Sequence, residues 1–280
     1  MSAFDPTAYW DAGAIAYDRW WVPIVAPAGT GLLDRIEREV AGRRAAPREL
    51  LDLGTGSGVL AIEAVRRWPE ATATGMDPAP GMLRIAADRA AGLPAAARAR
   101  LNWVQGAAEA IPFAEARFDA VVCAFVYQFL LDRKRALAEI RRVLRPSGTF
   151  AWVTWIAGPI PAMPADDTFQ DVLDGLGLEW LGENRPRGKR PISPQSAARE
   201  LRSAGFVRVR AREVSLVHQF DRERYLDQLE QDEARLTFAN LEPQARRRLR
   251  DEIRRRWSSL PNDAFLMQRR LVSVIASSER

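Results

Sequence analysis

The chain has 280 residues, of which 47% are hydrophobic and 28% charged, a composition that fits a globular protein and excludes the disordered and fibrous classes. No apolar run reaches the roughly 20 residues that a membrane-spanning helix needs, and the first residues lack the basic start and apolar stretch of a secretory signal. The single cysteine, Cys123, excludes an intramolecular disulfide and a cysteine zinc cage. We therefore expect a cytoplasmic protein without an integral membrane segment.

The net charge of +5 raises the question of an anionic partner. Acidic residues are interspersed through most of the arginine-rich stretches, but residues 246–256 (RRRLRDEIRRR) are an exception. In that region Leu249, Ile253 and Trp257 have the spacing of one buried stripe on a helix. We interpret the arginines as the solvated face of this helix and expect no nucleic-acid partner. The alternative interpretation is that the arginines bind nucleic acid or anionic lipid.

The first 50 residues contain two helical patterns, around 7–20 and 29–43. Between residues 50 and 155 short apolar runs alternate with helical patterns. The runs predict strands at 50–53, 71–76, 101–104, 118–124 and 149–155, and the patterns predict helices at 59–68, 81–91 and 133–144, with a Pro-Ser-Gly turn at 146–148. Strands that alternate with helices of about 10–15 residues indicate βαβ units and a parallel sheet.

After a proline-rich linker, helical patterns recur at 167–176, 197–204, 221–237 and 242–258, and strand patterns at 207–217 and 265–276. The whole predicts an α/β fold: a Rossmann-like, seven-stranded, mostly parallel sheet with helices on both faces, an N-terminal helical lid and a helical insertion before the last strand. We expect residues 1–48 to form the N-terminal helices or lid and 49–157 the cofactor-binding core. Residues 158–280 are expected to hold the linker, the helical insertions and the remaining strands of the same domain.

The strongest motif is a glycine loop, residues 54–58 (GTGSG), which follows the first predicted strand. Glycines at alternating positions allow positive φ angles and a close approach of a ligand to the backbone. The motif is weak by itself, but Asp52 precedes it and Asp77 ends the second strand, where a carboxylate can accept from both hydroxyls of a ribose. The spacing differs from the G-x-G-x-x-G pyrophosphate fingerprint, which argues against a nicotinamide dehydrogenase.

Four stretches in order, LLDLGTGSGVLAIEA, TGMDPAPGML, QGAAEAIPF and FDAVVCAFVYQFLLDRKRALAEIRRVLRPSGTFAWVTW, resemble class I S-adenosylmethionine-dependent methyltransferases. Within that class the sequence is most similar to the small-molecule branch that holds the ubiquinone and menaquinone C-methyltransferases and many natural-product methyltransferases. The resemblance covers about residues 10–155 well and the rest only in general layout. It implies S-adenosyl-L-methionine as the cofactor.

The resemblance assigns the cofactor site to the glycine loop, the ends of the second and fourth strands, the third motif and one tyrosine of the N-terminal helices. The residues are Tyr17, Asp52, Gly54, Thr55, Gly56, Gly58, Asp77, Pro78, Met82, Ala107, Ala108, Glu109, Cys123, Ala124 and Phe125. The methionine part is expected on the glycines, with Asp52 near its amino group and Tyr17 near its carboxylate. The ribose is expected on Asp77, with Pro78 and Met82 beside the adenine, and residues 123–125 beneath the sulfonium.

The third motif departs from the family. It commonly reads Gly-Asp-Ala-Glu, whose Asp accepts from the adenine amino group, whereas residues 106–109 here read Gly-Ala-Ala-Glu. Ala107 and Ala108 then occupy the turn that closes on the adenine edge. The adenine amino group must be received by a backbone carbonyl, by Glu109 or by water, and Glu109 is equally compatible with an exposed loop position.

The catalytic residue stays unknown, with Tyr17, Tyr127 and His218 as candidates. The cofactor carries an activated methyl group, so the protein mainly positions an acceptor and excludes water, and no metal site is expected. His218, the only histidine, is more often structural in such an apolar context. Cys123 fits a small buried residue better than a nucleophile.

The segment after the fourth strand reads Cys-Ala-Phe-Val-Tyr-Gln and lacks the Asn/Asp-Pro-Pro-aromatic signature that holds a flipped base, which argues against methylation of a base amine. Tyr127 and Gln128 are predicted to lie in a small-acceptor pocket. The tryptophans of the N-terminal helices, such as Trp10 and Trp20, suggest an aromatic lid over a planar acceptor, or they pack the lid on the core.

The sequence thus predicts a methyltransferase that transfers a methyl group from S-adenosylmethionine to a small, aromatic or hydrophobic acceptor. The alternatives are a non-catalytic protein that binds S-adenosylmethionine and a methyltransferase that acts on nucleic acid or lipid. The acceptor atom stays open, and a monomer and a homodimer are both compatible with the sequence.

Overall fold

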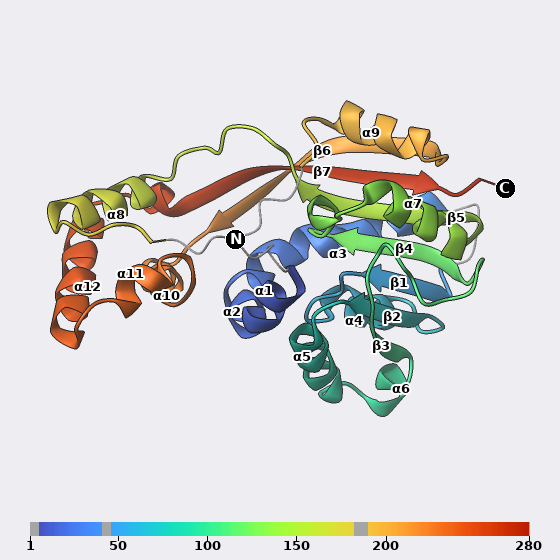
Figure 1. The fold of residues 1–280 in the computed structure, drawn as a ribbon, viewed down its shortest axis with the longest axis horizontal. Coiled ribbons are helices and arrows are strands. Elements are labelled where there is room, and N and C mark those ends of the chain that lie inside the picture. Colours follow the sequence, from blue (N-terminus) through green and yellow to red (C-terminus); the bar gives the residue numbers. More distant parts are fainter. Residues whose placement is uncertain (1–5, 41–45, 182–189, 280) are drawn as a thin grey trace. The chain divides into compact units, whose positions relative to one another are not determined.

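The computed structural model describes residues 6–40, 46–181 and 190–279 (Figure 1). The strands are β1 (Glu49–Leu53), β2 (Thr72–Asp77), β3 (Leu101–Gln105), β4 (Phe118–Ala124), β5 (Leu144–Trp155), β6 (Val207–Gln219) and β7 (Leu266–Ser277). The chain divides into two compact units. The first holds Met1–Gly158, Pro186–Val214 and Arg270–Arg280, and the second holds Pro159–Arg185 and Ser215–Arg269. The expectation that residues 158–280 share one domain with the core stays a prediction.

The sheet has seven strands in the order β3-β2-β1-β4-β5-β7-β6. The first five strands of that order are parallel neighbours, and β7 lies antiparallel to β5. This confirms the predicted Rossmann-like, mostly parallel sheet. The strand order reverses between β1 and β4, so the chain leaves these two neighbouring strands in opposite directions. In open α/β sheets ligands bind at the carboxyl ends of the strands at such a switch point.

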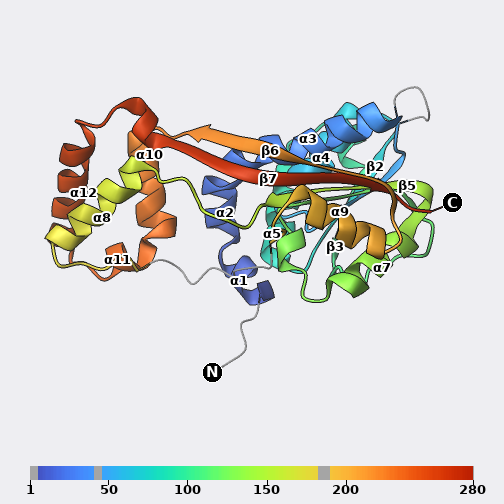
Figure 2. The same cartoon turned by 90° about the horizontal axis from the view of Figure 1, so that it is seen from above.

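The helices of the first unit are α1 (Pro6–Ala12), α2 (Ala14–Trp20), α3 (Val22–Val40), α4 (Val59–Arg67), α5 (Pro80–Ala91), α6 (Ala95–Arg98), α7 (Arg133–Val143) and α9 (Pro194–Ser203). Buried side chains of α7 and α9, among them Leu137 and Leu201, pack with Cys123 and Trp152 in one apolar cluster. Helices α3 and α4 cover the other face of the sheet (Figure 2), as the predicted two-sided arrangement requires.

The N-terminal helices differ from the prediction. The pattern at 7–20 forms two helices that break at Gly13, because a glycine inside a helix carries an entropic cost and offers no side chain to pack. Helix α3 starts at Val22 rather than at residue 29 and continues through Pro27, since the buried Ile24 and Val25 favour the earlier start. Residues 41–43 of the predicted helix lie outside the described residues.

The predicted Pro-Ser-Gly turn lies inside a longer β5. Phe118 of β4 pairs with Leu144 and Ala120 pairs with Thr149, so β5 carries extra residues between these two pairs. Ser147 has a φ of +61°, which the strand accommodates as a bulge. The local turn chemistry is therefore real, but the hydrogen bonding on both sides keeps it within one strand.

The second unit contains α8 (Pro164–Gly175), α10 (Arg222–Gln228), a π-helical turn (Leu229–Glu233), α11 (Arg235–Ala239), α12 (Pro243–Trp257) and the 3-10 turn Asn262–Phe265. The predicted helix at 221–237 is thus interrupted by the π-helical turn. Leu249, Ile253 and Trp257 are buried on one side of α12, which confirms the predicted stripe. Trp257 stacks on Tyr225 with ring centroids 5.7 Å apart and meets Phe265 edge-on at 5.0 Å.

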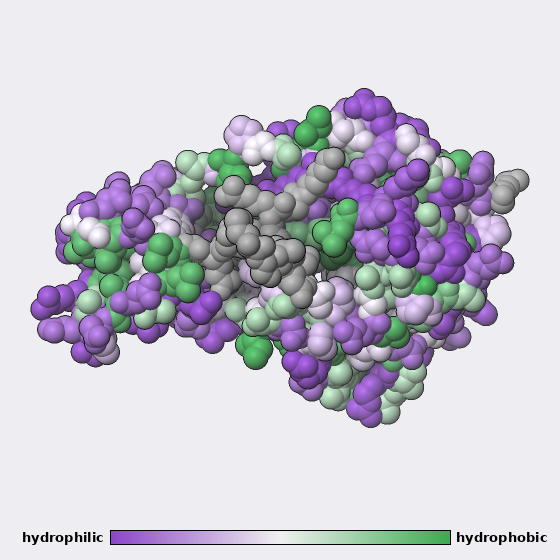
Figure 3. Space-filling model, viewed as in Figure 1, coloured by the Kyte–Doolittle hydropathy of each residue, from purple (hydrophilic) through white to green (hydrophobic). Residues whose placement is uncertain are grey.

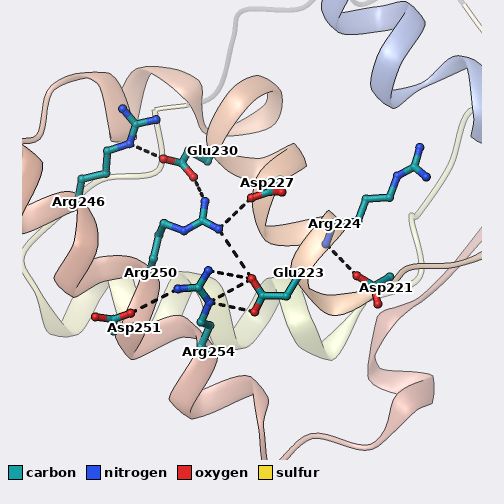
Figure 4. Close-up of polar contacts among 9 residues, drawn as sticks. All are labelled: Asp221, Glu223, Arg224, Asp227, Glu230, Arg246, Arg250, Asp251 and Arg254. Carbon is teal, nitrogen blue, oxygen red and sulfur yellow. Dashed lines mark hydrogen bonds and ion pairs between the residues drawn. The ribbon is translucent and has the colours of Figure 1, made fainter.

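Acidic partners neutralise much of the arginine-rich face of α12 (Figure 4). Arg246 and Arg250 both bind the buried carboxylate of Glu230 in the π-helical turn, and Arg250 also lies 2.8 Å from Asp227. Arg254 lies 2.8 Å from Glu223 of α10. The paired arginines form intramolecular contacts between helices, and the absence of a nucleic-acid partner stays a prediction.

No helix within the described ranges is long and apolar enough to cross a membrane. On the face drawn in Figure 3 hydrophilic residues predominate and apolar residues lie in separate groups. The described residues also contain no group of three or more histidine, cysteine or acidic side chains that could hold a metal ion.

Candidate cofactor site

The glycine loop (residues 54–58) bends tightly between β1 and α4. Gly54, Gly56 and Gly58 have φ angles of +69°, +53° and +79°, which side chains rarely adopt. The backbone N–H groups of Gly54 and Thr55 donate to the carbonyl of Met76 at 2.7 and 3.0 Å, so the loop is fixed on the end of β2. The sequence therefore needs glycine here for the backbone conformation.

The three glycines differ in what surrounds them. A Cβ on Gly54 would lie 2.3 Å from the Val126 side chain, and one on Gly58 would lie 2.6 Å from the Trp103 ring. A Cβ on Gly56 would meet only the sulfur of Met82, at 4.0 Å. Protein atoms thus cover Gly54 and Gly58, whereas Gly56 leaves room for a group from outside. Sequence reasoning missed Val126 and Trp103, because no motif marks an apolar residue that covers a loop.

Asp52 holds the loop from inside. Its Oδ2 accepts from the Thr55 hydroxyl at 2.6 Å and from the backbone N–H of Ala61 at 3.2 Å. The side chain is buried, and this burial raises the pKa of Asp52 to about 7. Asp52 therefore joins β1, the loop and the first turn of α4; a contact with the cofactor amino group stays a prediction.

Asp77 lies at the end of β2 directly against the loop. Its Oδ2 accepts from the backbone N–H of Gly56 at 2.9 Å, and its Oδ1 accepts from that of Ala79 at 2.9 Å. Burial raises the pKa of the Asp77 carboxyl above its ordinary value, and the two backbone donors oppose that rise. Each carboxylate oxygen keeps a further lone pair for an outside hydroxyl. Gly56 and Asp77, which were predicted from separate motifs, are thus in direct contact. The carbonyl of Pro78 accepts from the side-chain amide of Gln105 at 3.1 Å.

An aromatic bridge, defined as Tyr9, Trp10, Tyr17 and Phe129, lies beside this loop. Trp10 and Tyr17 pack against a small apolar cluster of Ala14, Ala79 and Met82 at the end of β2. The Trp10 ring meets Tyr17 edge-on at 5.3 Å and Phe129, which follows β4, at 5.4 Å. The bridge thus joins residues that follow β2 to Phe129, which follows β4, and β1 lies between these two strands in the sheet.

The third motif lies in a short turn closed by pairing of Ala107 with Ala110. Ala107 is exposed and Ala108 is buried in the core cluster. The Glu109 carboxylate accepts from the backbone N–H groups of Leu131 and Asp132 at 3.0 and 3.3 Å. Glu109 therefore holds the segment before α7. This role differs from the two that the sequence left open, an adenine contact and an exposed loop position. No local sequence pattern indicates it, because Leu131 and Asp132 are more than 20 residues away along the chain.

The carboxyl end of β4 is strained. Phe125 has a φ of +60°, which is rare for a bulky residue, and its ring lies 4.9 Å from that of Trp155. Its N–H donates to Val153 at 2.7 Å. Ala124 is half-buried, whereas Cys123 is fully buried and burial raises the pKa of its thiol, as expected for a packing residue rather than a nucleophile.

The remaining candidates lie elsewhere. Tyr127 is fully buried and stacks on Trp152 with ring centroids 4.1 Å apart, and burial raises its pKa, so the phenol stays protonated at neutral pH. This position suits core packing rather than contact with an acceptor. Gln128 accepts from the Thr154 hydroxyl at 3.0 Å. His218 belongs to the second unit, edge-on to Phe220 at 4.6 Å, and burial lowers its pKa.

The sequence and the fold of the chain are similar to those of known proteins. A family model described as "Methyltransferase domain" matches residues 51–152. The chain is 32% identical over 188 residues to the demethylmenaquinone methyltransferase of Deinococcus radiodurans, over 62% of this chain and 75% of that protein. It is also 32% identical over 200 residues to the ubiquinone/menaquinone biosynthesis C-methyltransferase of Dinoroseobacter shibae, over 66% of this chain and 78% of that protein.

A solved structure of phosphoethanolamine N-methyltransferase 2 from Haemonchus contortus, in complex with phosphomonomethylethanolamine and S-adenosylhomocysteine, has the same fold. The TM-score is 0.56 at 18% identity, over 99% of this chain and 59% of that chain. The sheet order and the glycine loop are those of a Rossmann-like methyltransferase. The chain belongs to the class I S-adenosylmethionine-dependent methyltransferases and, among them, resembles the quinone C-methyltransferases.

Proposed function

We propose that S-adenosylmethionine binds at the carboxyl end of β1, with its methionine part on the glycine loop and its ribose on Asp77. The observation that carries this proposal is the open side of Gly56, whose own N–H donates to the Asp77 carboxylate at 2.9 Å. A ligand that packs on Gly56 therefore has two acceptor oxygens beside it, which suits a ribose diol. The cofactor supplies an activated methyl group at this place.

The adenine side follows from the turn at residues 106–109. Because the Glu109 carboxylate is engaged by the backbone of Leu131 and Asp132, we infer that a backbone carbonyl or water receives the adenine amino group. Pro78 and Met82 flank this side, since both lie close to Asp77 or Gly56. Tyr17 packs against the cluster of Ala14, Ala79 and Met82, and its expected contact with the methionine carboxylate stays a prediction.

The acceptor is proposed to be small and aromatic or hydrophobic. The aromatic bridge supports this, because flat rings beside the open Gly56 offer stacking surfaces and exclude water. Bound there, the cofactor would supply its methyl group to a nucleophilic atom of the acceptor, and the aromatic bridge would position that acceptor and exclude water. The names of the two relatives, a demethylmenaquinone methyltransferase and a ubiquinone/menaquinone biosynthesis C-methyltransferase, agree with a planar acceptor.

The reaction is proposed to depend on positioning and desolvation rather than on a side-chain base. Burial keeps the Tyr127 phenol protonated, and the Asp52 carboxyl is enclosed by Thr55 and the first turn of α4. An acceptor that is already nucleophilic at neutral pH fits this arrangement. The cytoplasmic location stays a prediction. The oligomeric state, a monomer or a homodimer, also stays open.

The test is cofactor binding to Asp77→Ala, measured by calorimetry with S-adenosylmethionine and S-adenosylhomocysteine. We expect affinity to fall at least about 100-fold, because two ribose hydroxyls lose a charged acceptor. Asp119→Ala is the matched control: its carboxylate also accepts from two backbone N–H groups at 2.9 Å, but near the amino end of β4. Unchanged affinity in Asp77→Ala would refute the assignment.

The acceptor class is tested by methyl transfer from labelled cofactor to hydroquinones, catechols, phosphoethanolamine and nucleic acid. Transfer to a planar phenolic acceptor and a raised KM for that acceptor in Trp10→Ala would support the proposal. Transfer only to phosphoethanolamine or nucleic acid would contradict it. Tight cofactor binding without transfer to any acceptor would favour the non-catalytic alternative.

A further inference from the structure

One arginine connects the N-terminal helices with the glycine loop. Arg89 of α5 donates from Nη1 to the carbonyl and the hydroxyl of Ser57, at 2.8 and 2.7 Å. Its Nη2 donates to the Asp18 carboxylate of α2 at 2.7 Å. Ser57 stands between Gly56 and Gly58 and is 2% exposed. A single guanidinium therefore holds the loop on one side and the helical lid on the other.

The geometry requires arginine. A guanidinium is planar and presents donors in a fixed fork, so its two terminal nitrogens can serve two separate segments. A lysine ammonium can reach one of them but cannot reproduce both directions. The Ser57 carbonyl is buried, so loss of its donor leaves an unsatisfied acceptor inside the loop.

A second carboxylate attaches the same helices to α5. Asp11 of α1 accepts from the backbone N–H of Gly81 in the first turn of α5, where a negative charge is favourable. Asp11 and Asp18 each follow directly after an aromatic residue of the bridge, Trp10 and Tyr17. The two anchors thus fix the two lid aromatic rings that lie nearest the end of β2.

We propose that Arg89 is a positioning residue that couples the ordering of α1 and α2 to the conformation of the glycine loop. The inference rests on the proposed function, in that the cofactor packs on Gly56 beside Ser57. A cofactor that stabilises the loop then also stabilises the lid, and by linkage an ordered lid raises the affinity for the cofactor. Arg89 touches neither the cofactor nor the acceptor, and acts through Ser57 and Asp18.

The decisive variants are Arg89→Met, which keeps the length of the side chain, Arg89→Lys and Asp18→Asn. Hydrogen exchange of residues 6–20 is measured without ligand and with S-adenosylhomocysteine, and affinity is measured by calorimetry. In Arg89→Met we expect faster exchange of residues 6–20 without ligand, weaker ligand-induced protection and about tenfold lower affinity. Arg89→Lys should recover part of the loss, and Asp18→Asn added to Arg89→Met should weaken binding no further.

Arg67→Met is the matched control. The side chain of Arg67 is 22% exposed, against 33% for that of Arg89. Arg67 lies in the last turn of α4, at the end away from the glycine loop, and it pairs with Asp34 and, at 3.5 Å, with Glu63. It should leave affinity and the exchange of residues 6–20 unchanged. Thermal unfolding shows whether each variant folds. If Arg89→Met does not fold, Asp18→Asn is compared with the wild type in its place.

Equal exchange of residues 6–20 in Arg89→Met and wild type, without ligand, would overturn the inference. This readout needs no cofactor, so it separates the inference from the proposed function. A wild-type protein that binds neither S-adenosylmethionine nor S-adenosylhomocysteine would refute the cofactor site and its linkage to the lid, whereas the exchange comparison without ligand would still test whether Arg89 orders α1 and α2. Wild-type affinity and full ligand-induced protection in Arg89→Met would refute the coupling while the cofactor site stands.

Discussion

Alanine at Gly56 separates the backbone requirement of the loop from its ligand requirement. Gly56 has a φ of +53°, and a Cβ there would meet only the Met82 sulfur at 4.0 Å. The positive φ alone costs about 1–2 kcal/mol for an L residue, and no steric overlap adds to it. We therefore expect Gly56→Ala to lower the free energy of unfolding by about this amount. Its affinity for S-adenosylmethionine should fall at least about tenfold, because the new methyl group fills the space that the cofactor needs.

Two other glycines provide the comparison. Gly177 has a φ of +67° with nothing within 4 Å of its Cβ position, and it lies in the second unit. Gly177→Ala should thus show the same loss of stability and full cofactor affinity. Gly58 has a φ of +79°, and its Cβ would lie 2.6 Å from Trp103 and 2.8 Å from Ala86. Gly58→Ala should lose about 1–3 kcal/mol more than the other two, because of overpacking.

The assay combines denaturant unfolding of the three variants with calorimetric titration of S-adenosylmethionine. We expect two different rankings of the variants. Gly56→Ala and Gly177→Ala should be equally stable, and both should be more stable than Gly58→Ala. Only the two loop variants, Gly56→Ala and Gly58→Ala, should bind S-adenosylmethionine more weakly. Wild-type affinity in Gly56→Ala, at the stability of Gly177→Ala, would show that the cofactor does not approach Gly56. A loss of affinity in Gly177→Ala would show that the binding defect follows from backbone strain anywhere in the chain.

Two further predictions concern stability. Burial holds the pKa of Asp52 at about 7, against about 4 in an unfolded chain. Between pH 4 and pH 7 the folded state therefore holds a proton on Asp52 that the unfolded state has lost. The free energy of unfolding should decrease by at most about 4 kcal/mol as the pH rises through this range. Unfolding curves from pH 5 to 8 should show a smaller dependence of stability on pH in Asp52→Asn than in the wild type. An identical slope in that variant would contradict the assignment. Trp257→Ala should destabilise the second unit by about 3–5 kcal/mol, because Trp257 is 2% exposed and stacks on Tyr225. Arg248→Ala, on the exposed side of the same helix, should change stability by less than about 0.5 kcal/mol, and a similar loss in both variants would argue against the buried stripe.

The part of the site that could be predicted follows from the sheet. Buried apolar runs specify parallel strands, and the carboxyl ends of parallel strands meet at one edge. The adjacency of Gly56 and Asp77, which stand on the ends of neighbouring strands, is a consequence of that geometry. Glycine itself signals positive φ, so the loop conformation could also be predicted.

Side-chain partners across the fold could not be predicted, because periodicity carries no information about them. The helical pattern at 221–237 is continuous, yet the structure inserts a π-helical turn whose Glu230 receives Arg246 and Arg250 from α12. The contacts of Arg89 with Ser57 and Asp18 are of the same kind. In the sequence pattern of an amphipathic helix, an arginine that binds another segment looks the same as an arginine exposed to solvent. Only the tertiary structure shows which arginine makes such a contact.

The strained end of β4 shows a different limit of prediction. Positive φ is expected from sequence at glycine, where it costs little, but Phe125 adopts +60° with a bulky side chain. A glycine would adopt this backbone conformation at little cost, whereas Phe125 is strained there. The tilted contact of its ring with that of Trp155, with centroids 4.9 Å apart, and the hydrogen bond from its N–H to the Val153 carbonyl offset part of the cost. Sequence therefore indicates a glycine that adopts a positive φ, but it does not indicate a bulky residue such as Phe125 that tertiary contacts hold in the same conformation.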